Sequence, residues 1–326
     1  MVSLIIPCYN AEEYIGRCLD SVLSQTYKNI ELIMVNDGAT DNTGKIIESY
    51  KDKLQNSITK FIYIEQENQG VGAACNNALK RVTGDFLMLL DSDDFLLPDS
   101  IRMQCEWLER NCEYGVVRTN GYYVKENDLE ACDRLLEVNE YMKRKEYVFD
   151  ELFDGTTYLW PGTYMIRMEV LERLYPTRNI YPSRNGQNMQ ILMMASYISK
   201  AGFIDVPLMK YVVRKESLSH FSVGNVMKRE LEAMDSYKDI RKHLVKQFIS
   251  EDVQKQWNDR IEKLYANIYL DISIKYKDRK LAKMCYANIK KRNMLTLDCK
   301  IKYYQLINPF WHYCLRIIRK IRLNKS

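Results

Sequence analysis

Three aspartates, Asp91, Asp93 and Asp94, directly follow an apolar run from Phe86 to Leu90. Side chains alternate between the two sides of an extended chain, so Asp91 and Asp93 point to the same side. Two unit charges about 4 Å apart repel by about 1 kcal/mol in water, and by several times more near a protein interior. A divalent cation removes this repulsion, and oxygen ligands suit Mg²⁺ or Mn²⁺. The spacing therefore predicts a metal site, although a polar loop followed by a capped helix would have the same composition.

Short apolar runs alternate with segments of helical periodicity in the first hundred residues. The runs predict strands at Ser3–Pro7, Ile30–Val35, Phe61–Glu65 and Asp85–Leu90. Asn10 and Glu13 form a candidate capping box for the first helix. This alternation is typical of an α/β fold with a mostly parallel central sheet flanked by helices. Ligands of such sheets bind beyond the carboxyl ends of the strands, where the three aspartates lie.

The rest of the chain has a mixed and then a helical pattern. The segment "YLWPGTYMIR" predicts a turn leading into a strand, "QNMQILMMASYISK" predicts a helix, and "FIDVPLMKYVVR" predicts a strand pair. From residue 222 the sequence is helical and highly charged. We expect one domain at 1–221, made of halves 1–98 and 99–221, and a helical region at 222–326.

Composition narrows the class of protein. The chain has 326 residues, of which 46% are hydrophobic and 28% charged, with a net charge of +5. This is the composition of a globular protein, and no nucleic-acid-binding motif accompanies the basic residues. Nine cysteines without a CxxC pair indicate reduced thiols rather than disulfides or a zinc site. With no signal peptide and no apolar stretch of about 18 residues, we expect a cytoplasmic protein.

Three segments carry a resemblance to a known family. In order and spacing, "SLIIPCYNAEEYIGRCLDSVLSQTYKNIELIMVNDGATDNT", "ENQGVGAACNNAL" and "GDFLMLLDSDDF" resemble the nucleotide-sugar-binding half of family 2 inverting glycosyltransferases. The resemblance extends over residues 1–220 and implies a GT-A fold, with a donor-nucleotide half at 1–98 and an acceptor half at 99–221. It implies transfer of a sugar, with inversion, from a nucleoside-diphosphate donor, a UDP-sugar being favoured. The second half looks like enzymes of bacterial surface-polysaccharide synthesis, which implies a glycan or lipid-linked oligosaccharide acceptor.

The same resemblance implies a set of donor-binding residues. They are Pro7, Tyr9, Asn10, Asp37, Asn68, Gly70, Asp91 and Arg214. Of these, Pro7, Tyr9 and Asn10 would line the base and ribose. Asp37 would bond to a base edge of the uracil type, and Arg214 would reach the diphosphate.

A metal site and an acceptor surface are implied as well. The implied metal ligands are Asp91, Asp93 and His220, which would hold Mn²⁺ or Mg²⁺. Contact with the ribose is the alternative for Asp91, and contact with a phosphate is the alternative for His220. A metal held by acids stabilises the charge that develops on a departing diphosphate. Trp160, Pro161 and Gly162 would form part of the acceptor floor, since a Trp face suits stacking on sugar C–H groups. Packing in the core is an equally ordinary role for Trp160.

Two positions depart from the family pattern on the donor side. Asn36 and Asp37 stand where an aspartate pair is usual, and Asp37 keeps the carboxylate. Cys75 stands where an arginine that contacts donor phosphate or uracil is common. The second departure puts donor affinity or donor identity in question.

A third departure concerns the catalytic base. Many relatives carry a Glu-Asp pair where this chain has Gln187 and Asn188, and the Asp of that pair deprotonates the acceptor. Amides do not accept a proton usefully, although they can hydrogen-bond a sugar hydroxyl. Either another carboxylate is the base, with Asp94 and Asp154 as candidates, or the amide pair orients an acceptor whose proton leaves by another route.

The last 26 residues, 301–326, combine aromatic and aliphatic side chains with six Lys or Arg and no acid. This pattern predicts an interfacial helix on an anionic membrane leaflet, so we expect peripheral contact with the inner face of the plasma membrane. A basic helix packed on the protein body and an end without fixed structure are the alternatives.

One function of a different class also fits. A non-catalytic sugar-nucleotide-binding subunit that scaffolds a partner transferase would explain Cys75 and the amide pair. An oxidoreductase is disfavoured, because "GVGAAC" lacks the third glycine of the dinucleotide fingerprint and follows the third strand.

Overall fold

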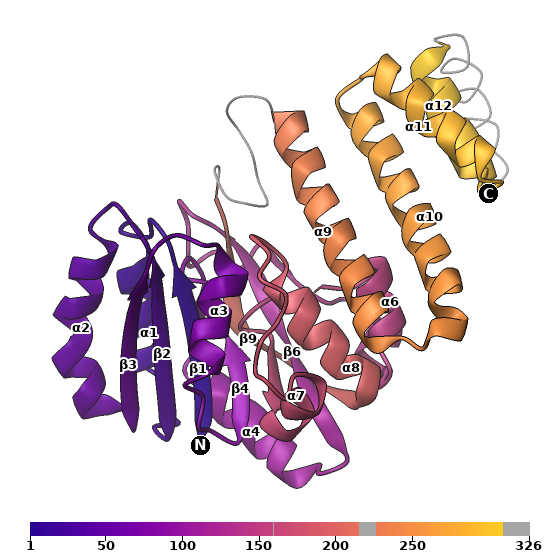
Figure 1. Cartoon of the computed structure of the whole chain (residues 1–326). Coiled ribbons are helices and arrows are strands. Elements are labelled where there is room, and N and C mark those ends of the chain that lie inside the picture. Colours follow the sequence, from indigo (N-terminus) through magenta and orange to yellow (C-terminus); the bar gives the residue numbers. More distant parts are fainter. Residues whose placement is uncertain (159, 215–225, 309–326) are drawn as a thin grey trace, which may run out of the picture. The chain divides into compact units, whose positions relative to one another are not determined.

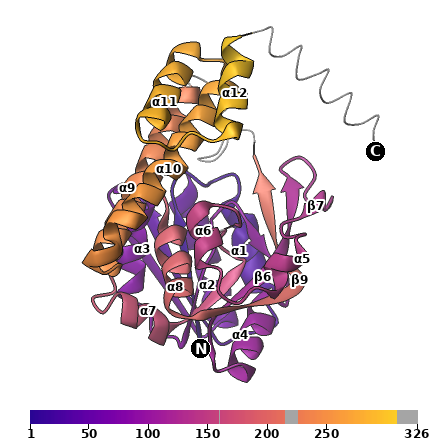
Figure 2. The same cartoon turned by 90° about the vertical axis from the view of Figure 1, so that its right-hand side faces the viewer.

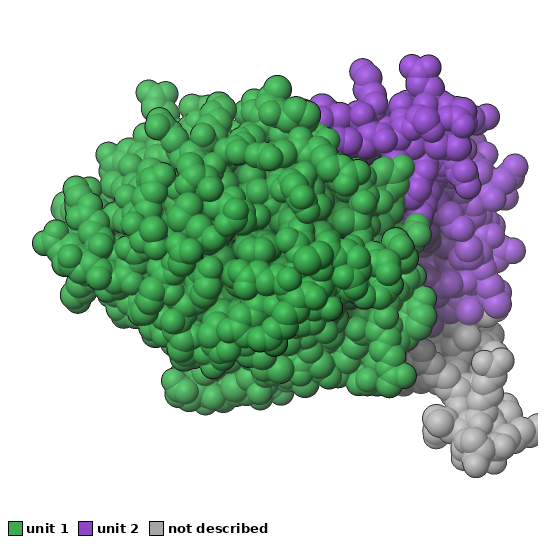
Figure 3. Space-filling view, turned by 90° about the horizontal axis from the view of Figure 1, so that it is seen from below, with its two compact units in different colours: residues 1–215 green, residues 216–326 purple. Residues whose placement is uncertain are grey.

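The computed structural model describes residues 1–158, 160–214 and 226–308. The chain divides into two compact units, Met1–Lys215 and Glu216–Ser326, which Figure 3 shows in green and purple. The boundary that the sequence predicts, between residues 221 and 222, lies outside the described residues.

The first unit is built around a nine-stranded sheet of order β3-β2-β1-β4-β8-β6-β9-β5, with β7 paired to β6 (Figure 1). Its first part consists of β1 (Val2–Cys8), β2 (Ile30–Asp37), β3 (Lys60–Gln66) and β4 (Phe86–Leu89). These four strands are parallel, and every residue of β1 and β2 is buried, as expected for central strands covered on both faces. The four predicted strands and their parallel arrangement are confirmed.

The second part of the sheet is mixed. It consists of β5 (Phe95–Leu96), β6 (Tyr114–Lys125), β7 (Arg134–Leu135), β8 (Tyr164–Arg167) and β9 (Lys200–Val213). β8 runs antiparallel to β4 and β6, whereas β9 is parallel to β6. The predicted strand pair is wrong, because β9 is a single strand. Its register against β6 shifts between Ile204 and Pro207, so the exposed residues between them form a bulge and not a turn.

Helices cover both faces of this sheet (Figures 1 and 2). α1 (Ile15–Leu23), α2 (Thr43–Ser57) and α4 (Ser100–Arg110) share one hydrophobic core with the strands. α3 (Val71–Leu79) contacts β1 and β2 from the other face. The remaining elements are α5 (Glu140–Arg144), α6 (Phe149–Asp154), α7 (Met168–Leu174), a π-helical turn at Met189–Met193 and α8 (Met194–Ile198). The predicted helix after residue 186 is confirmed, with a π turn as its first part.

The predicted capping box at the first helix is wrong. α1 begins at Ile15, its N-cap residue is Tyr14, and no side chain caps it. Asn10 instead adopts a positive φ of 48°, and its Oδ1 accepts a hydrogen bond of 2.8 Å from the backbone N–H of Thr40. Asn10 therefore ties the loop after β1 to the loop after β2.

The second unit is helical, as predicted. It contains α9 (Val226–Phe248), α10 (Glu251–Lys275), α11 (Arg279–Lys291) and α12 (Leu297–Ile307), with α10 in contact with the other three. Ala266, Leu270, Ala282, Ile289 and Cys299 form its core. Within the part of the chain that the structure describes, no helix has the length and apolar character that crossing a membrane requires. Residues 309–326, most of the predicted interfacial segment, lie outside it.

Candidate active site

The polar segments predicted to bind the donor follow four neighbouring parallel strands. Because β1, β2, β3 and β4 run in the same direction, the segments that follow them meet at one edge of the sheet. After β4, the N–H of Leu90 donates to the carbonyl of Ile5 at 3.0 Å, which keeps the chain beside β1. Asp91 therefore leaves the sheet at this edge.

Asp91 and Asp93 lie close together at the carboxyl edge of the parallel strands, and we call this pair of carboxylates the acidic centre. Burial, and then the negative charge of Asp93, raise the pKa of Asp91 to about 7. Asp93 Oδ2 is bonded to Arg214, at 2.7 Å from Nη2 and 2.9 Å from Nε. The Arg214 guanidinium also lies over the ring of Tyr14, 4.3 Å from its centre. The predicted metal ligand Asp93 and the predicted diphosphate ligand Arg214 are thus in direct contact.

The pair of carboxylates fits a divalent cation. The raised pKa of Asp91 reports burial and like charge, which are the two conditions that a bound cation relieves. Among the described residues, no third His, Cys, Asp or Glu completes a group able to hold a metal ion. The predicted third ligand, His220, lies outside those residues.

Arg17 holds the acidic turn in place, a role that sequence reasoning missed. Its Nη2 donates to the backbone carbonyl of Asp93 at 2.8 Å, and its guanidinium lies 5.5 Å from the ring centre of Phe95. Within the turn, the N–H of Asp94 donates to the carbonyl of Asp91 at 3.1 Å. A cation on α1 thus fixes the backbone of the acidic turn through a carbonyl group and does not bond to the Asp91 or Asp93 carboxylate.

Asp94 does not face the same way as Asp91 and Asp93. It is 1% exposed, and its Oδ1 accepts a hydrogen bond of 2.8 Å from the backbone N–H of Val212 in β9. Burial, followed by the charge of Asp93, raises the pKa of Asp94 well above its ordinary value. These contacts favour a positioning role, in which Asp94 holds the end of β9 and so the nearby Arg214, over the predicted role of base. The other base candidate, Asp154, is the last residue of α6.

Asp37 organises the loop that follows β3. The carboxylate is 4% exposed, and its Oδ1 accepts hydrogen bonds from Gln66 Nε2 at 2.7 Å and from the N–H of Gln69 at 2.9 Å. Its Oδ2 accepts from the N–H of Gly70 at 2.8 Å. Contact with a nucleotide base stays a prediction, and the observed partners of Asp37 are groups of the protein.

The other predicted nucleotide-binding residues lie at the same edge. Pro7 is buried within β1, Tyr9 is 48% exposed, and Asn68 is exposed in the loop that Asp37 holds. Gly38 has φ +72°, and a Cβ there would lie 2.7 Å from the backbone nitrogen of Asn68. The close approach of these two loops therefore requires glycine at position 38.

A strap formed by residues 180–188 lies against α3. Asn76 clamps it through two hydrogen bonds with the backbone of Ile180, at 2.9 and 2.7 Å. The N–H of Gly72 donates to the carbonyl of Ser183 at 3.0 Å, and a Cβ at Gly72 would lie 2.6 Å from that oxygen. Sequence reasoning missed this contact, and the only local signal for it is the spacing of two glycines at the start of α3.

The strap carries the amide pair to the acidic centre. Gln187 is 7% exposed, and its Nε2 lies 3.5 Å from Asp91 Oδ1, the limit of a hydrogen bond. Asn188 Oδ1 accepts a hydrogen bond of 2.8 Å from the hydroxyl of the fully buried Tyr164. The Asn188 carboxamide therefore has its oxygen engaged by Tyr164, and the Gln187 carboxamide has its NH₂ directed at Asp91. Both amides can donate hydrogen bonds, but neither can take a proton.

Comparison with known proteins identifies the family. The model of the family described as "Glycosyl transferase family 2" matches residues 3–175, more than half of the chain. The chain belongs to glycosyl transferase family 2. Glycosyltransferase GlyA of Streptococcus pneumoniae is 28% identical over 244 residues, which cover 72% of this chain and 33% of GlyA. EpsH of Bacillus subtilis is 31% identical over 223 residues, which cover 67% of this chain and 62% of EpsH. The chain thus spans less than two thirds of either relative.

Solved structures show the fold of this family 2 protein. TarS 1–349 of S. aureus in complex with UDP-GlcNAc is similar with a TM-score of 0.61 and 19% identity, covering 95% of this chain and 80% of that one. Mannosyltransferase PcManGT from Pyrobaculum calidifontis, in complex with GDP-Man and Mn²⁺, gives a TM-score of 0.56 at 16% identity, covering 100% of this chain and 88% of that one. The predicted GT-A fold is confirmed.

In this family 2 chain the predicted acceptor residue Trp160 belongs to an aromatic cluster, and Pro161 and Gly162 follow it. The Trp160 ring stacks on Tyr211 with 4.4 Å between ring centres. The rings of Trp160 and Tyr123 meet edge to face, with 5.0 Å between their centres. Pro161 is buried, and Gly162 has φ +82° and donates its N–H to the carbonyl of Leu89 at 2.6 Å. One face of Trp160 is thus covered by protein, which supports packing for that face, and the acceptor role stays a prediction.

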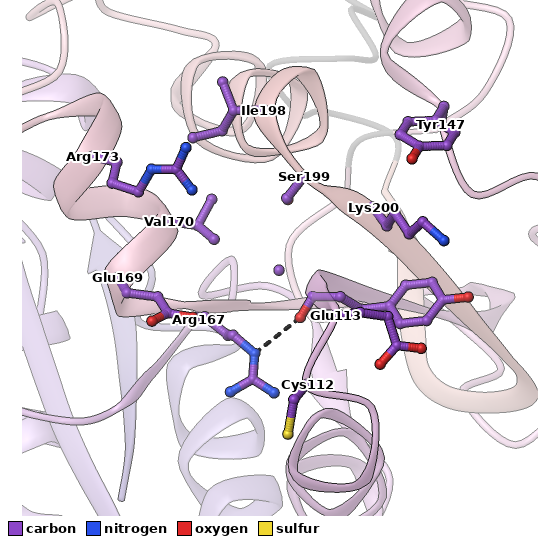
Figure 4. A pocket seen from close by; sticks show the side chains of 12 residues that line it. Cys112, Glu113, Tyr147, Arg167, Glu169, Val170, Arg173, Ile198, Ser199 and Lys200 are labelled. Atoms are coloured by element: carbon purple, nitrogen blue, oxygen red, sulfur yellow. Dashed lines mark hydrogen bonds between the residues drawn. The ribbon is translucent and has the colours of Figure 1, made fainter.

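A separate pocket lies away from the predicted residues (Figure 4). Its volume is about 340 Å³, and the charged side chains of Glu113, Arg167, Arg173 and Lys200 are among its lining. Figure 4 shows the Arg167 Nε bonded to the backbone carbonyl of Tyr114, at 2.9 Å. Since acids and bases are mixed here and no predicted site residue lines it, the pocket is not the donor site that the sequence predicts.

Proposed function

We propose that this protein is an inverting glycosyltransferase that moves a sugar from a UDP-sugar to a glycan or a lipid-linked oligosaccharide in the synthesis of a cell-surface polysaccharide. The observation that carries the proposal is the convergence of Asp91, Asp93 and Arg214 at the carboxyl edge of the parallel strands. The exposed Tyr9 and Asn68 lie at the same edge, where a nucleotide needs flat and polar partners. The names of the relatives and the UDP-GlcNAc bound in the TarS structure support this choice.

On the donor side, Asp91 and Asp93 would hold Mn²⁺ or Mg²⁺, and the Mn²⁺ in the PcManGT structure supports this. When bound, the cation supplies positive charge that stabilises the leaving diphosphate. Arg214 keeps its guanidinium beside Asp93, where its N–H groups can bind a phosphate of the donor. Arg17 holds the backbone of the acidic turn, and Asp94 holds the end of β9. Together they would fix the positions of Asp93 and Arg214.

On the acceptor side, the amide pair would orient the attacking hydroxyl. The NH₂ groups of Gln187 and Asn188 can donate hydrogen bonds to the oxygen of that hydroxyl, and Tyr164 fixes the Asn188 carboxamide. Attack in line with the departing diphosphate inverts the anomeric centre. Asp94 and Asp154 stay the predicted candidates for the base.

The proposal predicts that UDP is released from one UDP-sugar in a screen of donors, and that this release depends on Mn²⁺. Hydrolysis without acceptor should be slow and should rise when membrane extract supplies acceptors. The measurement is UDP release with and without Mn²⁺ and with EDTA as the control. If calorimetry detects no UDP binding with any divalent ion, the proposed function is wrong.

A non-catalytic sugar-nucleotide-binding subunit is the second candidate. It is favoured by the amide pair and by Cys75, whose thiol is fully buried with a pKa raised first by burial and then by Asp91 and Asp37. This function predicts Mn²⁺-dependent UDP binding but no turnover of any donor, even with membranes present. The same donor screen therefore separates the two candidates.

We propose peripheral contact with an anionic membrane surface through residues 301–326, with α11 adding to it. Lys280, Lys283, Lys290 and Lys291 are exposed at helical spacing on α11, and Met284, on the same face, is 62% exposed. Cationic side chains around an apolar one suit the headgroup region of an anionic leaflet.

Charge reversal tests this contact. Lys283→Glu with Lys290→Glu should lower partitioning onto vesicles with 30 mol% phosphatidylserine by at least about 30-fold, since each lysine near such a surface contributes about 1 kcal/mol and two are lost. Lys51→Glu with Lys53→Glu, which are exposed on α2, form the matched control and should leave partitioning unchanged. Equal partitioning of both variants and of the wild type, measured by co-sedimentation, would exclude a role of α11.

A further inference from the structure

The carboxyl edge of β1, β2, β3 and β4, where the proposed function places the donor, is called the donor edge. Asp37, Asp91 and Asp93 lie there, and a nucleoside diphosphate adds more negative charge. α3, which follows β3 at this edge, has the sequence VGAACNNAL and carries no charged residue. Arg214 is bonded to Asp93, and Arg17 is bonded to the backbone of the acidic turn. A further positive charge at this edge would add to those of the proposed cation and of Arg214 when an anionic donor binds.

Arg184, on the strap, is a cation at this edge that has no hydrogen-bond or ion-pair partner among the described residues. Its side chain is exposed, and it makes no hydrogen bond or ion pair within that part of the chain. Its Cα and Cγ both lie 3.0 Å from the position that a Cβ on Gly70 would take. Gly70 has φ +91° and donates its N–H to Asp37. Arg184 thus packs directly on the loop that Asp37 organises.

The other end of the strap reaches the acidic centre. Three residues after Arg184, the Gln187 amide lies beside Asp91. The hydrogen bonds of Ser183 and Ile180 with α3 fix the strap at its start. The strap therefore runs from Gly70, where Arg184 packs, to Asp91, where Gln187 lies.

We propose that Arg184 binds a phosphate group of the nucleotide-sugar donor and supplies the positive charge that α3 lacks at Cys75. The guanidinium fork matches the geometry of phosphate oxygens, and both partners of such a pair are charged, which strengthens its hydrogen bonds. A charge from the strap also explains why Cys75 can be a buried, uncharged thiol. This assignment rests on the proposed function, because it takes the donor to be a nucleoside diphosphate.

The experiment compares UDP with uridine, which has the same base and ribose but no phosphate. With Mn²⁺ present, Arg184→Ala should weaken UDP binding by about 10-fold, measured by calorimetry, and leave uridine binding unchanged. Arg184→Lys should recover part of the UDP affinity, because it keeps the charge without the fork. Arg173→Ala, an exposed arginine on α7, is the matched control and should bind UDP like the wild type.

Each other outcome has a distinct meaning. Equal UDP affinity of the wild type and Arg184→Ala would overturn the assignment and leave the proposed function intact. An equal loss of UDP and uridine binding would also overturn it, since it would report displacement of the strap. Failure of the wild type to bind UDP with any divalent ion would overturn the proposed function together with this assignment. Circular dichroism and thermal unfolding of each variant show that the fold is kept.

Discussion

Asp93→Ala is expected to lower Mn²⁺-dependent donor hydrolysis and transfer by about 100-fold to 1,000-fold, the range found when one electrostatic contact to a developing charge is removed. Asp93 is the predicted metal ligand whose carboxylate is partly exposed and already holds a cation, the guanidinium of Arg214. Its removal leaves Asp91 alone with the metal and removes the partner that positions Arg214. The measurement is UDP release as a function of Mn²⁺ concentration.

Asp52→Ala is the matched control for this prediction, because Asp52 is an exposed aspartate on α2. It should keep wild-type activity. The loss of the Asp93–Arg214 ion pair, which is mostly buried, also lowers stability, so thermal unfolding is followed for both variants. Activity of Asp93→Ala within a few-fold of the wild type, at a temperature where the variant is folded, would rule out Asp93 as a metal ligand.

Asn188→Asp is expected to raise the rate of transfer by at least about 10-fold, since a positioned general base contributes about 100-fold to 10,000-fold. The change replaces an amide by a carboxylate of the same shape at a position where the Tyr164 hydroxyl donates at 2.8 Å. The new carboxylate works only when deprotonated, so the added rate should increase with pH through its pKa.

The measurement is the pH–rate profile of transfer for the wild type and Asn188→Asp. Gln187→Glu is the matched control, because its carboxylate would face Asp91 Oδ1 where the Nε2 now lies at 3.5 Å. Repulsion between these two acids should prevent any gain in rate. An unchanged rate and an unchanged profile for Asn188→Asp would mean that Asn188 does not face the acceptor hydroxyl.

Much of the donor edge could be predicted from the sequence because its signals are local. Runs of apolar residues mark β1, β2, β3 and β4, and polar residues follow each run directly. Parallel pairing then requires these polar segments to meet at one edge, whatever the details of packing. This pattern therefore places Asp91 and Asp93 close to each other and close to the loops that follow β1 and β2.

Contacts between distant segments could not be predicted in this way. Asp94 accepts a hydrogen bond from the backbone N–H of Val212, 118 residues away, and this contact favours a positioning role for a residue that the sequence predicts as a candidate base. Asn10 has the composition of a helix cap, yet its side chain bonds to Thr40 because α1 begins only at Ile15. In both cases a neighbour in space, which the local pattern does not specify, satisfies the polar group.

By itself the sequence determined the parallel strands, the glycines of the loops and the carboxylates at the strand ends, since strand periodicity and turn chemistry act over a few residues. Only the tertiary structure decided that the strap lies on α3, that Arg184 packs on Gly70 and that Gln187 meets Asp91. The physical reason is that a buried polar group needs a hydrogen-bond partner, and that two backbone segments can approach closely only where one of them has a glycine. Which distant segment supplies them is settled by the packing of the whole first unit.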